Sequence, residues 1–119
     1  SRLSGLKFIG DGRFDAYITP PNHKGFSAKK LFDESGKIKW GAIAYIDKNG
    51  GGPEGNHTHS ENHIFIVVDG EAKIILGDKE VIVKKNDSIF VNGMTPHSIW
   101  NNADQTATVI KISIEGGAE

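Results

Sequence analysis

The chain has 119 residues, a formal net charge of −1 and no cysteine. A chain of this length is expected to form one domain whose core needs no disulfide. Without cysteine, any metal must be bound by nitrogen and oxygen. The balanced charge and the lack of a basic block argue against nucleic acid and membrane surfaces as partners. The longest apolar run, Ile64–Val68, is far too short for a membrane span, and no signal-peptide pattern opens the chain, so we expect a cytoplasmic protein.

Residues 1–37 are weakly patterned, and we expect them to form strands or an arm that packs on the remainder of the molecule. Leu6–Ile9 and Ala16–Ile18 have the composition of short strands. Ser27–Phe32 fits either a strand or one helical turn, whereas Pro20-Pro21-Asn22 predicts a loop.

Residues 38–115 alternate short β-rich runs with turn signals, which is typical of an all-β sandwich or barrel. The first run, Ile38–Ile46, places four side chains on one face: Trp40, Ala42, Ala44 and Ile46. The glycine-rich segment 47–53 then predicts a loop.

Six further strands are expected: His63–Val68, Ala72–Leu76, Glu80–Val83, Ser88–Val91, His97–Trp100 and Thr106–Ile114. Asp69-Gly70 predicts a tight hairpin, because both central positions of a type I′ turn need positive φ. Gly77-Asp78, Asn86-Asp87 and Asn92-Gly93 predict further turns. No repeat or low-complexity segment supports a second domain.

Four of the five histidines cluster between residues 57 and 97. His57, His59 and His63 are separated by even numbers of residues, so on an extended segment their imidazoles share one face. His97 comes after an intervening strand and is placed to supply a fourth ligand. Neutral imidazole is the commonest metal ligand, so these four histidines predict a metal site. The alternative is a cluster of solvated loop histidines.

The spacing around the cluster resembles the first motif of the cupin family. The matching residues are Gly51, five residues, His57-Thr58-His59, three residues, His63, six residues and Gly70. Histidine stands at position 63, where the family usually has glutamate. In the second motif the corresponding positions are Asn86, Asn92, Met94, His97 and Asn101, of which the last two keep the family identity. Asn86 still suits the role of the family's glycine, because asparagine tolerates the left-handed conformation.

The resemblance implies a double-stranded β-helix, or jelly-roll barrel, that holds a divalent transition metal (Mn, Fe, Ni, Zn or Cu) in one mouth. Four neutral imidazoles leave a divalent site at about +2, compared with about +1 when one ligand is a carboxylate, and this favours anionic or enolisable oxygen ligands. An octahedral shell with four protein ligands also has two open positions. By family analogy the small chain is expected to form a homodimer.

Three functions are compatible with these features. The first is a metal-dependent enzyme that acts on a small oxygenated or anionic molecule, with a dioxygenase-type oxidoreductase favoured over an isomerase, lyase or cyclase. The second is a non-catalytic module that binds or senses a small ligand such as a sugar acid. The third is a purely structural metal. No residue is predicted as a general acid or base, so the catalytic residues are unknown.

The residues outside the cluster are expected to have lesser roles. Glu61 and His23 are predicted to lie in solvent. Trp100 or Asn101 is predicted to orient the nearby His97. Tryptophans in such strands usually pack in the core.

Overall fold

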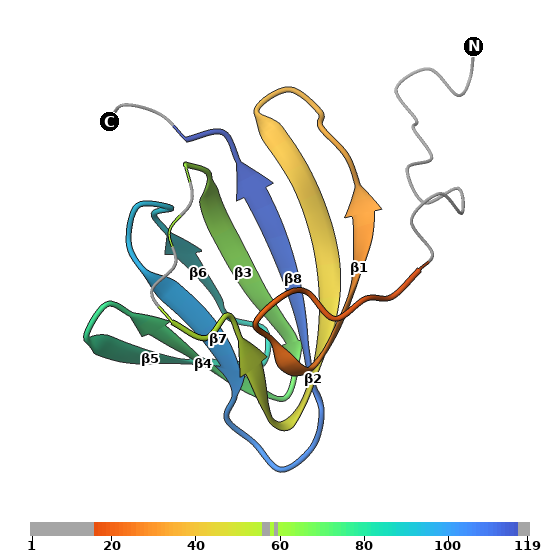
Figure 1. The fold of residues 1–119 in the computed structure, drawn as a ribbon, viewed down its shortest axis with the longest axis vertical. Helices are drawn as coiled ribbons and strands as arrows, with labels where there is room; N and C mark the ends of the chain where they lie inside the picture. The colour runs from red at the N-terminus through yellow and green to blue at the C-terminus, as the bar shows by residue number, and fades with distance from the viewer. Residues whose placement is uncertain (1–15, 56–57, 59, 117–119) are drawn as a thin grey trace.

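The computed structural model describes residues 16–55, 58 and 60–116. These residues form an all-β domain without a helix, as the sequence predicts (Figure 1). The strands are β1 (Lys24–Phe32), β2 (Ile38–Gly52), β3 (Asn62–Asp69), β4 (Glu71–Leu76), β5 (Lys79–Lys84), β6 (Ser88–Val91), β7 (His97–Asn101) and β8 (Ala107–Ile114). In this part of the chain no helix is present that could cross a membrane.

The strands form a nearly closed antiparallel barrel in the order β5-β4-β7-β2-β8-β3-β6, with β1 paired to β2. Strand β2 connects the two walls, because Ile38–Ile46 pairs with β8 whereas Gly51 and Gly52 pair with β7. Contacts from β5 to β3 and β6 bring the two ends of the sheet together. This is the jelly-roll barrel expected from the sequence.

The predicted loop at residues 47–53 is wrong, because β2 continues to Gly52. The glycines allow the strand to bend from one wall into the other. A Cβ on Gly50 would lie 2.4 Å from the carbonyl oxygen of Gly25, and one on Gly51 would lie 2.4 Å from that of Ile99. Only glycine fits such close backbone approaches, so the residues that resemble a loop signal provide a tightly packed strand junction.

The predicted hairpin at Asp69-Gly70 is also wrong. Strand β3 pairs with β6 and β8, whereas β4 pairs with β5 and β7, so the two residues connect the two walls. Gly70 has a φ of 78°, which suits a sharp change of direction. The expected turn at Gly77-Asp78 does form the β4–β5 hairpin, and Asn86 adopts the predicted left-handed conformation with a φ of 72°.

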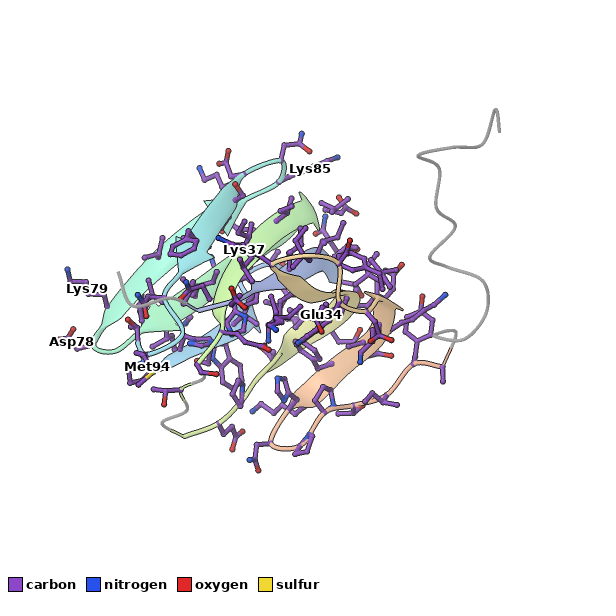
Figure 2. All side chains as sticks on the ribbon, turned by 90° about the horizontal axis from the view of Figure 1, so that it is seen from above. Glu34, Lys37, Asp78, Lys79, Lys85 and Met94 are labelled. Atoms are coloured by element: carbon purple, nitrogen blue, oxygen red, sulfur yellow. The ribbon has the colours of Figure 1, made fainter. Side chains whose placement is uncertain are left out.

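The barrel interior is filled by alternate side chains, as strand periodicity requires. On β3, Phe65 and Val67 are buried in the core together with Ile46 of β2 and Val109 of β8. Charged residues occupy the turns outside this core. Figure 2 shows Asp78 and Lys79 at the outer tip of the β4–β5 hairpin and Lys85 at the turn that follows β5.

The described part of residues 1–37 packs along β2. Strand β1 settles the alternative at Ser27–Phe32 in favour of a strand. Ala16–Ile18 contributes only one bridge, between Ile18 and Ala28, so the short strand expected there is reduced to a single pairing. Leu6–Ile9 lies outside the described residues.

Candidate metal centre and ligand cavity

Two of the four predicted metal ligands meet inside the barrel. His63 at the start of β3 and His97 at the start of β7 are 1% and 6% exposed, and their ring centroids lie 5.0 Å apart. The strands that carry them are not paired with each other, so the tertiary fold brings the two imidazoles together. His57 and His59 lie outside the described residues. Within the described residues, no group of three or more metal-binding side chains is present.

Both described imidazoles are oriented through Nδ1. The His97 Nδ1–H donates to the carbonyl oxygen of Thr95 at 2.8 Å. Nδ1 of His63 lies 3.1 Å from the hydroxyl oxygen of Ser113, which is fully buried on β8. These hydrogen bonds fix both rings, and at His97, where Nδ1 is the donor, the lone pair of the neutral imidazole lies at Nε2.

The expectation that Trp100 or Asn101 orients His97 is wrong. The indole N–H of Trp100 donates to the Ser98 hydroxyl at 2.8 Å, and the Asn101 amide donates to the backbone carbonyl of Ile46 at 2.8 Å. These side chains hold the end of β7 in place. The sequence contains no signal for the backbone carbonyl of Thr95, because any residue supplies one.

The described donors fit a transition metal. Two imidazoles from separate strands, each hydrogen-bonded at one ring nitrogen, are the usual way in which proteins present histidine to Zn, Cu, Fe or Ni. Nitrogen ligands of this kind can hold a divalent ion in a closed structural site. They can equally hold an ion that keeps coordination positions open for other ligands. The donor set is therefore consistent with the metal site that the sequence predicts.

A cavity of about 490 Å³ opens beside His97. Its wall is mainly apolar and includes Phe26, Trp40, Ala44, Phe65, Ile99 and Val109. The four side chains that the sequence groups on one face of the first strand, Trp40, Ala42, Ala44 and Ile46, all line this cavity. A cavity of this size and composition is typical of sites that bind small molecules.

Lys111 on β8 is a cavity residue that the sequence did not single out. It pairs with Ala42 of β2 and Phe65 of β3, and its ammonium lies 4.9 Å from the Trp40 ring centroid and 5.9 Å from that of Phe65. Burial lowers the pKa of Lys111 to about 8, although the negative charge of Glu61 acts in the opposite direction. A lone lysine at a strand position is usually a solvated side chain, so only the tertiary structure identifies it.

Glu61 and His23 are both less exposed than predicted. The Glu61 carboxylate accepts a hydrogen bond from the indole N–H of Trp40 at 3.3 Å, in a partly buried position. His23 lines the cavity, packs against Phe26 with ring centroids 4.5 Å apart, and donates from Nδ1 to the carbonyl oxygen of Pro21 at 2.8 Å. The loop that carries His23 folds back over the cavity, which its composition does not indicate.

Comparisons with known proteins agree with this architecture. Residues 44–114 match the family model described as a cupin domain. The polyketide cyclase RemF from Streptomyces resistomycificus superposes with a TM-score of 0.72 at 21% identity, over 92% of this chain and 79% of that one. A predicted oxalate decarboxylase from Thermotoga maritima gives 0.70 at 19% identity, over 92% and 99% of the two chains.

A third solved structure is the cupin domain of an XRE family transcriptional regulator from Enterobacter cloacae. It superposes with a TM-score of 0.68 at 14% identity, over 79% of this chain and all of that one. A comparison with curated proteins gives no match. At these identities the solved structures support the fold alone, whereas the family model covers more than half of the sequence. The barrel, the motif spacing and this match together show that the chain belongs to the cupin family.

Proposed function

We propose that this protein is a metal-dependent enzyme that acts on a small oxygenated or anionic molecule, with a dioxygenase-type oxidation as the favoured reaction. The observation that carries the proposal is the buried pair of imidazoles, His63 and His97, beside a cavity of about 490 Å³. His57 and His59 are proposed to complete the ligand set. A structural metal would not need an adjoining cavity large enough for a ligand.

The residues of the chain have separable tasks in this proposal. Ser113 and the Thr95 carbonyl hold the imidazoles at Nδ1. The apolar wall, which includes Trp40 and Phe65, excludes water from a bound ligand and strengthens the electrostatic interactions within the cavity. A bound divalent metal would supply Lewis acidity toward chelated oxygen atoms and open positions for further ligands.

The first test is the metal content of protein purified without chelators or an immobilised-metal column. About one equivalent of iron, manganese, nickel or copper per chain is expected, and the double variant His63→Ala/His97→Ala should lose it. His23→Gln is the matched control, because the His23 ring is hydrogen-bonded to the Pro21 carbonyl and packs on Phe26, and His23 is not a proposed ligand. Absence of metal from the wild-type protein, even after reconstitution with each ion, would contradict the proposal.

The reaction type is tested by oxygen consumption. Iron-loaded protein is given small diols and hydroxy acids in an oxygen electrode, and the double variant serves as the blank. Uptake that depends on His63 and His97 supports a dioxygenase. Substrate turnover without uptake would instead favour an isomerase, a lyase or a cyclase, the last being the activity named for the solved structure from Streptomyces resistomycificus.

A non-catalytic binding module is the second candidate. The likeness to the cupin domain of a transcriptional regulator, which matches over its whole length, favours it. In this case the metal-loaded protein would bind small acids tightly and return them unchanged. Mass spectrometry of the recovered ligand after prolonged incubation distinguishes binding from turnover.

A further inference from the structure

The Lys111 ammonium lies at the mainly apolar wall of the cavity. Lys111 is one of the lining residues, and its ammonium contacts the faces of two aromatic rings, Trp40 at 4.9 Å and Phe65 at 5.9 Å. The residues that pair with it across the sheet, Ala42 and Phe65, carry no charge. Among the described residues, the carboxylate of Glu61, just before β3, is the acidic group close enough to raise the pKa of this ammonium.

Phe65 connects this cation to the candidate metal centre. Its ring centroid lies 6.0 Å from that of His63 and 6.4 Å from that of His97, while Lys111 lies over the same ring. A flat ligand placed against Phe65 would be near both the imidazoles and the ammonium. Two polar groups of the cavity, the His97 imidazole and the Lys111 ammonium, therefore both lie beside the Phe65 ring.

We propose that Lys111 recognises an anionic oxygen of the ligand, so that the protein binds a compact aromatic acid with its acidic group at Lys111 and its other oxygens toward His63 and His97. The inference rests on the proposed function only for the metal-facing end. An ammonium partly removed from water is stabilised by an anion placed beside it, and a charge-assisted hydrogen bond is stronger in such a site than in solvent.

The surroundings of Lys111 argue for a ligand partner. The Glu61 carboxylate accepts the hydrogen bond from the Trp40 indole at 3.3 Å, and Glu61 does not line the cavity. Burial keeps the pKa of Lys111 at about 8 despite Glu61, so the nearby acid does not offset the loss of hydration. A bound carboxylate would supply the missing compensation and raise the pKa of Lys111.

The test uses two probes that differ by one carboxylate, 3,4-dihydroxybenzoate and catechol. Dissociation constants are measured by calorimetry at pH 7 with the zinc-loaded and metal-free protein, for the wild type and Lys111→Met. Lys84→Met is the control, because Lys84 is exposed on β5 and does not line this cavity. The wild type is expected to prefer the carboxylated probe by on the order of 10-fold.

Lys111→Met should abolish this preference and leave the affinity for catechol within about twofold, whereas Lys84→Met should keep it. The preference of the wild type should also fall as the pH rises through about 8, where Lys111 loses its charge. A preference that survives in Lys111→Met would overturn the inference. So would the absence of binding of the carboxylated probe to any form of the protein at millimolar concentration.

The same data separate this inference from the proposed function. If catechol binds only the metal-loaded protein and the carboxylate adds nothing, the metal site stands and the role of Lys111 is refuted. If the carboxylate preference depends on Lys111 but metal changes neither affinity, the anion site stands and chelation of the substrate is refuted.

Discussion

Replacing Lys111 by methionine is expected to stabilise the folded protein at neutral pH. Burial lowers the pKa of this lysine from 10.5 to about 8, which corresponds to about 3 kcal/mol of destabilisation by the charged form. The two aromatic contacts of the ammonium offset part of this cost, since a cation over a ring is worth about 0.5–2 kcal/mol. We therefore expect a gain of about 2 kcal/mol, or roughly 8 °C in Tm for a domain of this size.

The stability difference between Lys111→Met and the wild type should change with pH in a definite direction. Between pH 8 and 10.5 the unfolded chain binds more protons at Lys111 than the folded chain does, so wild-type stability rises with pH across this window. Below about pH 8 the cost of the charged form is fully present. The advantage of Lys111→Met should therefore be largest at pH 7 and should shrink as the pH approaches 10.

Urea unfolding at pH 7, 8.5 and 10 measures the difference, with Lys84→Met as the exposed control. The control should differ from the wild type by less than about 0.5 kcal/mol at each pH. If Lys111→Met is less stable than the wild type at pH 7, or if its advantage does not vary with pH, then burial of the ammonium is not costly and the reasoning is refuted.

Three further predictions concern the metal site and the strand junction. Ser113→Ala should weaken metal binding by about 10-fold in chelator competition, because it removes the hydroxyl beside His63 Nδ1. Ser88→Ala is the exposed control and should leave the metal affinity unchanged. An unchanged affinity in Ser113→Ala as well would contradict the role of this hydroxyl. His63→Glu should still bind one metal ion but shift its preference among ions, as elemental analysis of protein loaded from mixed ions would show; complete loss of metal would mean that residue 63 is not a ligand. Gly51→Ala should unfold the protein or lower its stability by more than about 3 kcal/mol, because its Cβ would lie 2.4 Å from the carbonyl oxygen of Ile99. Gly36→Ala should cost only about 1 kcal/mol in the same urea assay, since Gly36 also has a positive φ, of 63°, but no heavy atom within 4 Å of the added Cβ. Similar losses in both variants would refute the steric argument.

Local sequence patterns were sufficient to predict the class of fold and part of the site. Alternation along Ile38–Ile46 grouped on one face the four side chains that line the cavity, but it did not show that this face is internal. The same period puts His63, Phe65 and Val67 on one face of β3, and the structure buries all three. These features depend on the two-residue period of a strand, which does not need tertiary contacts. The ligand roles of all four histidines stay predictions, as do the homodimer and the identity of the metal.

Strand pairing and the environment of each inward side chain were decided by the tertiary structure. Asp69-Gly70 has the composition of a hairpin, yet it joins two walls, because burial of the inward faces of β3 and β4 in the closed barrel determines their partners. Along β8 the sequence predicts two alternating faces but does not indicate which one is internal. The structure turns Ala107, Val109, Lys111 and Ser113 inward. Lys111 lies over the ring of Trp40, and Ser113 is hydrogen-bonded to His63. Both partners come from other strands, so no local sequence pattern encodes these contacts, which only the closed barrel creates.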